Sequence, residues 1–176
     1  MTQEIKNSLL SSGQAIFEFF STNDTFQNVT YLSEGEENYI YKISGKKCSY
    51  VARILKPTNT RTVADYQFEF DFQDFLRENG IPVPQHYLSS TNSLFVSFQL
   101  GDTILKITLH DFKKGDIIEK PNPKQIYVVG ELLGKIHKLV QRFDPPQDRL
   151  EHIDSLAWVN ETNEPLTRGD LAEPDR

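Results

Sequence analysis

The sequence is poor in the residues that build disulfide frameworks and metal sites. Its single cysteine, Cys48, excludes an internal disulfide and is typical of a reducing compartment, so we expect a cytoplasmic protein. The four histidines are scattered along the chain and lack the spacing of metal ligands. The sequence therefore predicts neither a disulfide-stabilised domain nor a metal-binding motif.

Long hydrophobic runs and an excess of basic charge are also absent. No apolar stretch is long enough to cross a bilayer, and the N-terminus lacks the pattern of a signal peptide. The net charge is −6, and residues 144–176 alone carry nine acids and three bases, so residues 1–143 are formally neutral. We therefore expect no membrane partner and no nucleic-acid partner.

The residues that are present predict a globular α+β domain. Twelve phenylalanines and seven tyrosines supply core material, and charged residues make up 25% of the chain. Apolar residues at helical spacing predict helices over 4–21, 61–79 and 123–143. Alternating residues predict strands over 29–34, 39–44, 49–55, 93–100 and 103–110. Five strands joined by short turns favour one antiparallel sheet packed against a helix.

Two charged residues fall where the patterns favour apolar ones. Arg53 shares a face of the 49–55 strand with Val51 and Leu55, and Glu69 shares a helix face with Tyr66 and Leu76. A buried charge is costly unless it is paired, so one interpretation is that Arg53 and Glu69 bind each other. The other is that each lies in water, at a sheet edge or a helix rim.

Five short motifs occur in order between residue 29 and about residue 140. They are "GEENYIYKI" with Gly35, Asn38 and Tyr41, "YVARI" with Arg53, Glu69 followed by Leu76 and "GIPVP", "LHDFKKGD" at 109–116, and "ELLGKIHKL" at 131–139. Together they resemble the aminoglycoside phosphotransferase family, which includes choline, homoserine and methylthioribose kinases. No motif is specific alone, and the resemblance rests on their order and spacing.

The resemblance implies a protein kinase-like N-terminal lobe that binds ATP. The implied divisions are an N-terminal helix at 1–28, the lobe at 29–110, a hinge and connector at 111–122, and the start of a second lobe at 123–176. Free loop amides near Gly35 would approach the phosphates, and Asn38 would orient the loop through bonds from its side chain to the backbone. Arg53 would bind the α- and β-phosphates, and Glu69 would hold Arg53. The backbone of His110, Asp111 and Phe112 would contact adenine. The reaction implied is transfer of the ATP γ-phosphate, with Mg²⁺, to a hydroxyl of a small metabolite or an aminoglycoside-like substrate.

The catalytic loop and metal ligands of this family belong to the second lobe. The stretch "TRGDLAEPDR" at 167–176 offers Asp170 as a candidate base, but Arg168 stands where the family has histidine, and too few residues separate Asp170 from His137. His137 itself fits a structural position on a helix. We therefore expect the 176-residue chain alone to be inactive, and the 123–143 helix to be exposed and to favour self-association.

Three interpretations remain open from the sequence. The chain is the front portion of a small-molecule kinase, a non-catalytic degenerate relative used for binding or regulation, or an unrelated α+β interaction module. A contact between Arg53 and Glu69 is expected in the first two and not in the third.

Overall fold

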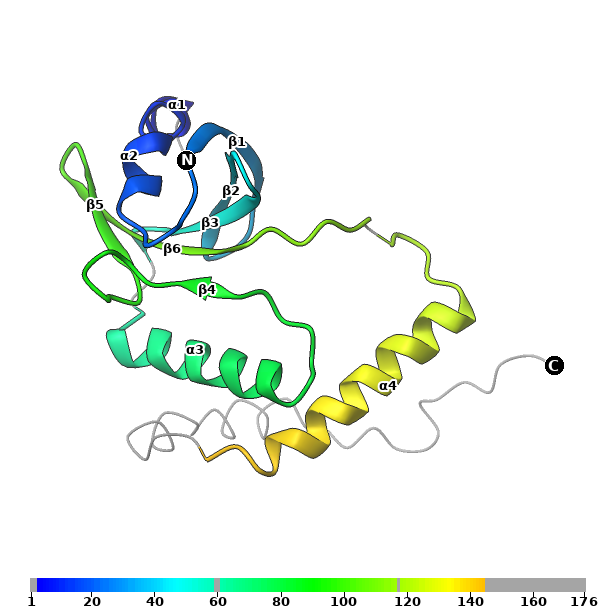
Figure 1. Ribbon diagram of the computed structural model, residues 1–176. Coiled ribbons are helices and arrows are strands. Elements are labelled where there is room, and N and C mark those ends of the chain that lie inside the picture. Colours follow the sequence, from blue (N-terminus) through cyan, green and yellow to red (C-terminus); the bar gives the residue numbers. More distant parts are fainter. Residues whose placement is uncertain (1–2, 59–60, 117, 145–176) are drawn as a thin grey trace. The chain divides into compact units, whose positions relative to one another are not determined.

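The computed structural model describes residues 3–58, 61–116 and 118–144 (Figure 1). All described helices and strands belong to one compact unit that ends at Phe143. The helices are α1 (Gln3–Ser11), α2 (Gly13–Glu18), α3 (Val63–Glu78) and α4 (Pro123–Val140). The strands are β1 (Phe26–Glu34), β2 (Asn38–Gly45), β3 (Ser49–Leu55), β4 (His86–Tyr87), β5 (Val96–Leu100) and β6 (Thr103–Asp111).

The strands form one antiparallel sheet, as predicted. Its order is β1-β2-β3-β6-β4, and β5 pairs with β6 off this path. The expected number of five strands was wrong, because β4 adds a sixth. Two residues cannot show an alternating pattern, and β4 exists only because His86 and Tyr87 pair with His110 and Leu109 of β6.

The two faces of the sheet are covered differently (Figure 1). One face packs against α1 and α2, and α3 lies on the opposite side. The first face holds the hydrophobic core, in which alternate residues of β2, β3 and β6 meet Leu9, Ile16, Phe17 and Phe20 from the two N-terminal helices. Intervening residues of β3, including Arg53, therefore face α3.

The helix predicted over 4–21 is broken into α1 and α2 at Ser12. Gly13 begins α2, and a Cβ atom built there would lie 2.4 Å from Val29 Cγ1 of β1. Only glycine permits this close approach of α2 to the edge of the sheet. The sequence periodicity continues across Gly13, so it could not locate the break.

Helices α3 and α4 match their predicted positions because their ends are specified locally. Each begins with a reciprocal capping box, formed by Thr62 with Asp65 and by Asn122 with Gln125. Helix α3 ends at Glu78, and Gly80, with φ of 78° in the left-handed region, follows its C-cap residue Asn79. These signals use side chains three residues apart, which can be read directly from sequence.

Helix α4 is the least covered element of the described chain. No residue of α4 is classed as buried, and its apolar residues Ile126, Val129, Leu133 and Val140 are 43–56% exposed. These four recur at helical spacing and form one stripe, which we call the α4 stripe. The predicted exposure is therefore confirmed. Among the described residues, no helix is both long enough and apolar enough to cross a membrane.

Candidate functional site

The structure brings Arg53 and Glu69 together, as one of the two interpretations predicted. Arg53 lies in β3 between the core residues Ala52 and Ile54, so its side chain points away from the core and toward α3. Its Nη1 donates a hydrogen bond to Glu69 Oε1. The Arg53 and Glu69 side chains are 26% and 20% exposed, so the pair is mostly buried but still accessible to water.

Glu69 has further partners that the sequence reading missed. Arg61 Nη2 lies 2.6 Å from Glu69 Oε2, and Gln73 Nε2 donates to Oε1 over 3.1 Å. Burial alone would raise the pKa of the Glu69 carboxyl, but the Arg53 and Arg61 guanidiniums outweigh that effect and hold the pKa below its ordinary value. Glu69 is therefore ionised at neutral pH. The predicted helix over 61–79 included Arg61, but α3 begins at Val63, and Arg61 reaches Glu69 from the segment before the helix.

The loop between β1 and β2 is shorter and more ordered than the sequence suggested. The Gly35 N–H donates to the Asn38 carbonyl over 2.9 Å, and the Glu37 carbonyl accepts from the Lys56 N–H over 2.9 Å. Lys56 Nζ also lies 3.0 Å from Glu34 Oε1, which balances one of the loop's acids. The Gly35 amide, expected to be free, is therefore already bonded within the loop.

At the end of β6, the backbone amides are likewise already hydrogen-bonded within the protein. The Asp111 N–H donates to the Gln85 carbonyl over 2.8 Å, and the Phe112 N–H donates to the Ser49 carbonyl over 3.0 Å. The Asp111 carboxylate accepts from the Tyr87 hydroxyl over 2.7 Å. Any ligand at this connector must use the carbonyl oxygens here or the amides that follow Phe112.

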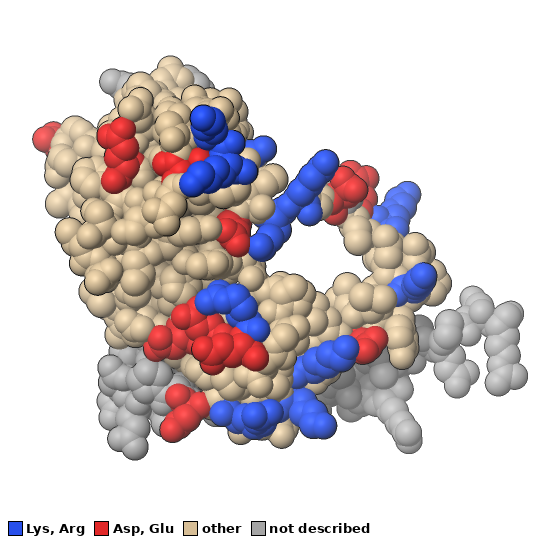
Figure 2. Space-filling view, in the orientation of Figure 1, with Lys and Arg blue, Asp and Glu red and all other residues tan. Residues whose placement is uncertain are grey.

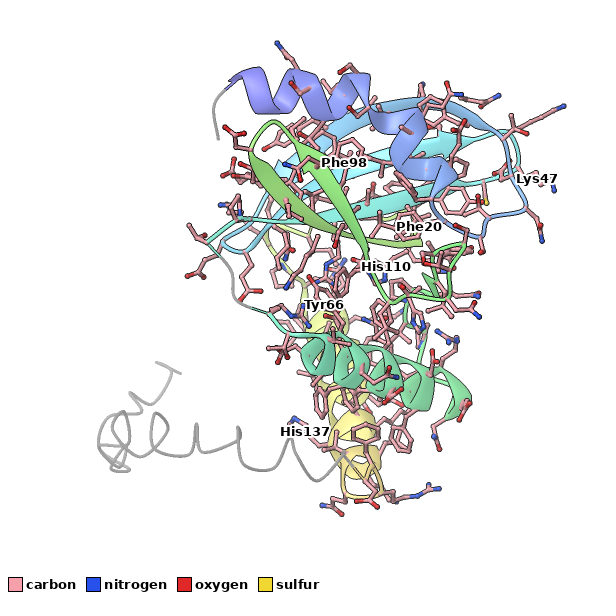
Figure 3. All side chains as sticks on the ribbon, turned by 90° about the vertical axis from the view of Figure 1, so that its left-hand side faces the viewer. Phe20, Lys47, Tyr66, Phe98, His110 and His137 are labelled. Atoms are coloured by element: carbon pink, nitrogen blue, oxygen red, sulfur yellow. The ribbon has the colours of Figure 1, made fainter. Side chains whose placement is uncertain are left out.

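His110 lies between the sheet and α3, next to the ion pair. Figure 3 shows its side chain on the sheet face that α3 covers, with Tyr66 pointing from α3 back toward the sheet. Its Nε2 lies 3.0 Å from Thr108 Oγ1, and its ring meets Phe70 edge-on at 5.7 Å. Burial, assisted by the positive charge of Arg53, lowers the pKa of His110 to about 4. His110 is therefore neutral at pH 7 and shapes the contact with α3.

The remaining candidates lie away from this site or outside the described residues. His137 is on the exposed α4 helix, apart from His110 in Figure 3. Asp170 lies outside the described residues. Within the described ranges, no group of three or more histidine, cysteine or acidic side chains could hold a metal ion.

A surface cavity of about 610 Å³ lies near the start of α3. It is lined by Phe19, Val63, Phe95 and the hydroxyl-rich stretch 89–93. Neither Arg53 nor Glu69 is among its described lining residues, so it is separate from the ion pair. On the face shown in Figure 2, acidic and basic side chains are interspersed and form no continuous basic surface.

These features define an α+β lobe of the kind found in protein kinase-like folds, in which a basic residue on the third strand pairs with a glutamate on the following helix. The model of the phosphotransferase enzyme family, APH, matches residues 28–175. The chain belongs to that family. The resemblance found in the sequence motifs is confirmed.

Solved structures support the same fold. An amicoumacin kinase, hAmiN, solved in complex with AMP-PNP, Ca²⁺ and Ami, matches with a TM-score of 0.63 and 20% identity over 85% of this chain and 45% of that one. A microcompartment-associated aminopropanol kinase matches with a TM-score of 0.57 and 14% identity over 77% of this chain and 42% of that one. The chain thus spans less than half the length of these structures. No curated protein sequence matches.

Proposed function

We propose that this chain is the ATP-binding lobe and hinge of a small-molecule kinase that transfers the γ-phosphate of ATP to a hydroxyl group. The observation that carries the proposal is the bond between Arg53 on β3 and Glu69 on α3. A guanidinium held in this way offers a fixed, permanently charged fork to phosphate oxygens. Family membership supports the reaction class, and the AMP-PNP in the amicoumacin kinase complex supports the nucleotide.

The contacts seen in the structure refine the assignment of each residue. Arg53 binds the α- and β-phosphates and Glu69 fixes its position. Because the Gly35 amide is engaged with Asn38, the amides of Glu36 and Glu37 at the loop tip are the donors that approach the phosphates. Because the Asp111 and Phe112 amides are engaged, adenine takes its donor from the following residue, Lys113, and its acceptor from a carbonyl of the connector.

The division of the chain follows from these roles. Residues 29–110 form the nucleotide-binding lobe, with 1–28 packed on it, and 111–122 form the hinge and connector. Residues 123–176 begin the second lobe, whose α4 stripe would be covered there. The base and the Mg²⁺ ligands belong to that lobe, with Asp170 as a candidate base. The acceptor is a small molecule, as the names of the structural relatives suggest.

Binding and turnover by the 176-residue protein test the proposal. Calorimetry with ATP and Mg²⁺ should show weak binding, because one lobe leaves adenine open to water on one side. Arg53→Met should weaken ATP binding at least tenfold. The control is Arg77→Met, which removes a guanidinium from α3 that is paired with Asp74 instead of Glu69.

The result also decides between the two functional alternatives. A phosphate-release assay should show no turnover by this protein, and turnover would restore Asp170 as the base. ATP binding that survives Arg53→Met would show that the phosphates lie elsewhere. Absence of any nucleotide binding would favour the non-catalytic module. No observation among the described residues supports that alternative.

A further inference from the structure

The carboxylate of Glu69 is shared by two arginines, so positively charged groups gather around it. Arg53 contacts Oε1 and Arg61 contacts Oε2. Lys106 Nζ adds a third positive charge nearby, because it donates to the Arg61 carbonyl. Two guanidiniums and one ammonium group thus gather near one carboxylate in a partly desolvated place. Positive charge gathered in this way favours the binding of an anion.

Arg61 is fixed in place by contacts on several sides. Its guanidinium lies over the Tyr66 ring, with 4.6 Å between the guanidinium carbon and the ring centroid, and its Nη2 donates to the Asp65 carbonyl over 3.2 Å. Tyr66 in turn packs against Phe95 with ring centroids 4.8 Å apart. The Arg61 side chain is only 19% exposed. It is therefore a built part of the site and not a mobile surface arginine.

The two arginines divide the carboxylate between them, and this division sets how much of Arg53 remains available. A guanidinium has five N–H donors, and a carboxylate with both oxygens open tends to take two of them in a bidentate pair. Because Arg61 occupies Oε2, Glu69 holds Arg53 through Oε1 and Nη1. The rest of the Arg53 fork is left for another acceptor.

We propose that Arg61 is a positioning residue for the phosphate site, acting on Arg53 through Glu69. By holding Oε2, Arg61 prevents Glu69 from taking both arms of Arg53 and thereby keeps Arg53 available to the polyphosphate of the nucleotide. Arg61 also keeps Glu69 neutralised when Arg53 turns toward phosphate. This inference rests on the proposed function and adds a residue to its site.

The first test compares ligands that differ only in phosphates. Calorimetry on the 176-residue protein should show ATP with Mg²⁺ binding about tenfold more weakly to Arg61→Met, while adenosine binds unchanged. Arg61→Lys retains the charge and should recover part of the loss. The matched control Arg77→Met should leave both ligands within twofold of wild type. A general structural defect would weaken adenosine as well, and that result would overturn the inference.

The second test asks whether Arg61 acts through Glu69. In a Glu69→Gln background, Arg61→Met should change ATP affinity less than twofold, because the carboxylate that Arg61 restrains is gone. An equal loss in both backgrounds would mean that Arg61 contacts the phosphates directly, and the positioning role would be wrong.

The two proposals fail in distinguishable ways. If wild-type protein binds no adenine nucleotide, the proposed function fails and the role of Arg61 fails with it. If ATP binds and is weakened by Arg53→Met but not by Arg61→Met, the proposed function stands and only the role of Arg61 is refuted.

Discussion

Replacing Glu69 with glutamine removes the charge that joins β3 to α3 while leaving the shape of the side chain almost unchanged. Arg53 and Arg61 would then face a neutral amide and repel each other. Breaking a fully buried pair costs about 3–5 kcal/mol, whereas an exposed pair contributes about 0–1 kcal/mol. Since these side chains are 19–26% exposed, we expect Glu69→Gln to lower the free energy of unfolding by about 2–3 kcal/mol.

Thermal unfolding followed by circular dichroism measures this loss. For a chain of this size the expected decrease in Tm is roughly 5–10 °C. Arg53→Met should cost less than Glu69→Gln, because Arg61 remains to balance the carboxylate. If Glu69→Gln and Arg53→Met both unfold at the wild-type temperature, the pair contributes nothing to stability and the reasoning from burial is refuted.

The same carboxylate gives the wild type a defined pH dependence. The pKa of Glu69 in the folded protein is below its ordinary value of 4.5, so the unfolded state binds the proton more readily. The stabilisation by Glu69 is therefore fully present above pH 4.5 and is lost as the pH falls through the folded pKa. The difference in stability between wild type and Glu69→Gln should narrow below pH 4.5, and a constant difference would contradict the ionised pair.

Three further predictions concern other parts of the lobe. The pKa of His110 is about 4 in the folded protein and 6.5 in the unfolded chain, so the free energy of unfolding should rise between pH 4 and 6.5 by up to about 3 kcal/mol. In urea titrations at several pH values, His110→Gln should flatten this rise. Gly45→Ala places a Cβ 2.2 Å from an Asp24 oxygen and should cost about 1–3 kcal/mol in the same assay, while Gly115→Ala, with open space around it, should cost under about 0.5 kcal/mol. Val129→Glu in the α4 stripe should reduce concentration-dependent self-association in analytical ultracentrifugation, and a monomeric wild type would refute that expectation.

The sequence predicted those features that depend on residues near one another in the chain. The positions of α3 and α4, the short turn between the last two strands and the alternation of β2 and β3 all arise within a few residues. The Arg53–Glu69 contact could also be predicted, although it joins two elements. It was predictable because each residue places a charge where the pattern favours an apolar side chain. Two such charges of opposite sign both become less costly to bury when they pair with each other.

The features that escaped prediction depend on the folded arrangement alone. The helix predicted over 61–79 included Arg61 and would have kept it about two turns away from Glu69. Because α3 begins at Val63, Arg61 lies before the helix and reaches Glu69 from there. The hydrogen bonds of the Gly35 and Phe112 amides depend on which carbonyls the sheet places opposite them. Backbone groups carry no sequence signal, so a motif can locate a binding loop without revealing which of its donors are already used.

The position of Glu69 depends on aromatic contacts on both sides of α3. On the sheet side, Phe70 stacks on His86 at 4.0 Å and meets His110. On the other side, Phe143, three residues beyond the end of α4, packs against Phe68, Phe72 and Phe75, with ring centroids 5.8, 5.1 and 5.1 Å away. Phe143 therefore helps to hold the helix that carries Glu69. The segment that follows α4 thus contributes to the position of the Arg53–Glu69 pair by packing on α3.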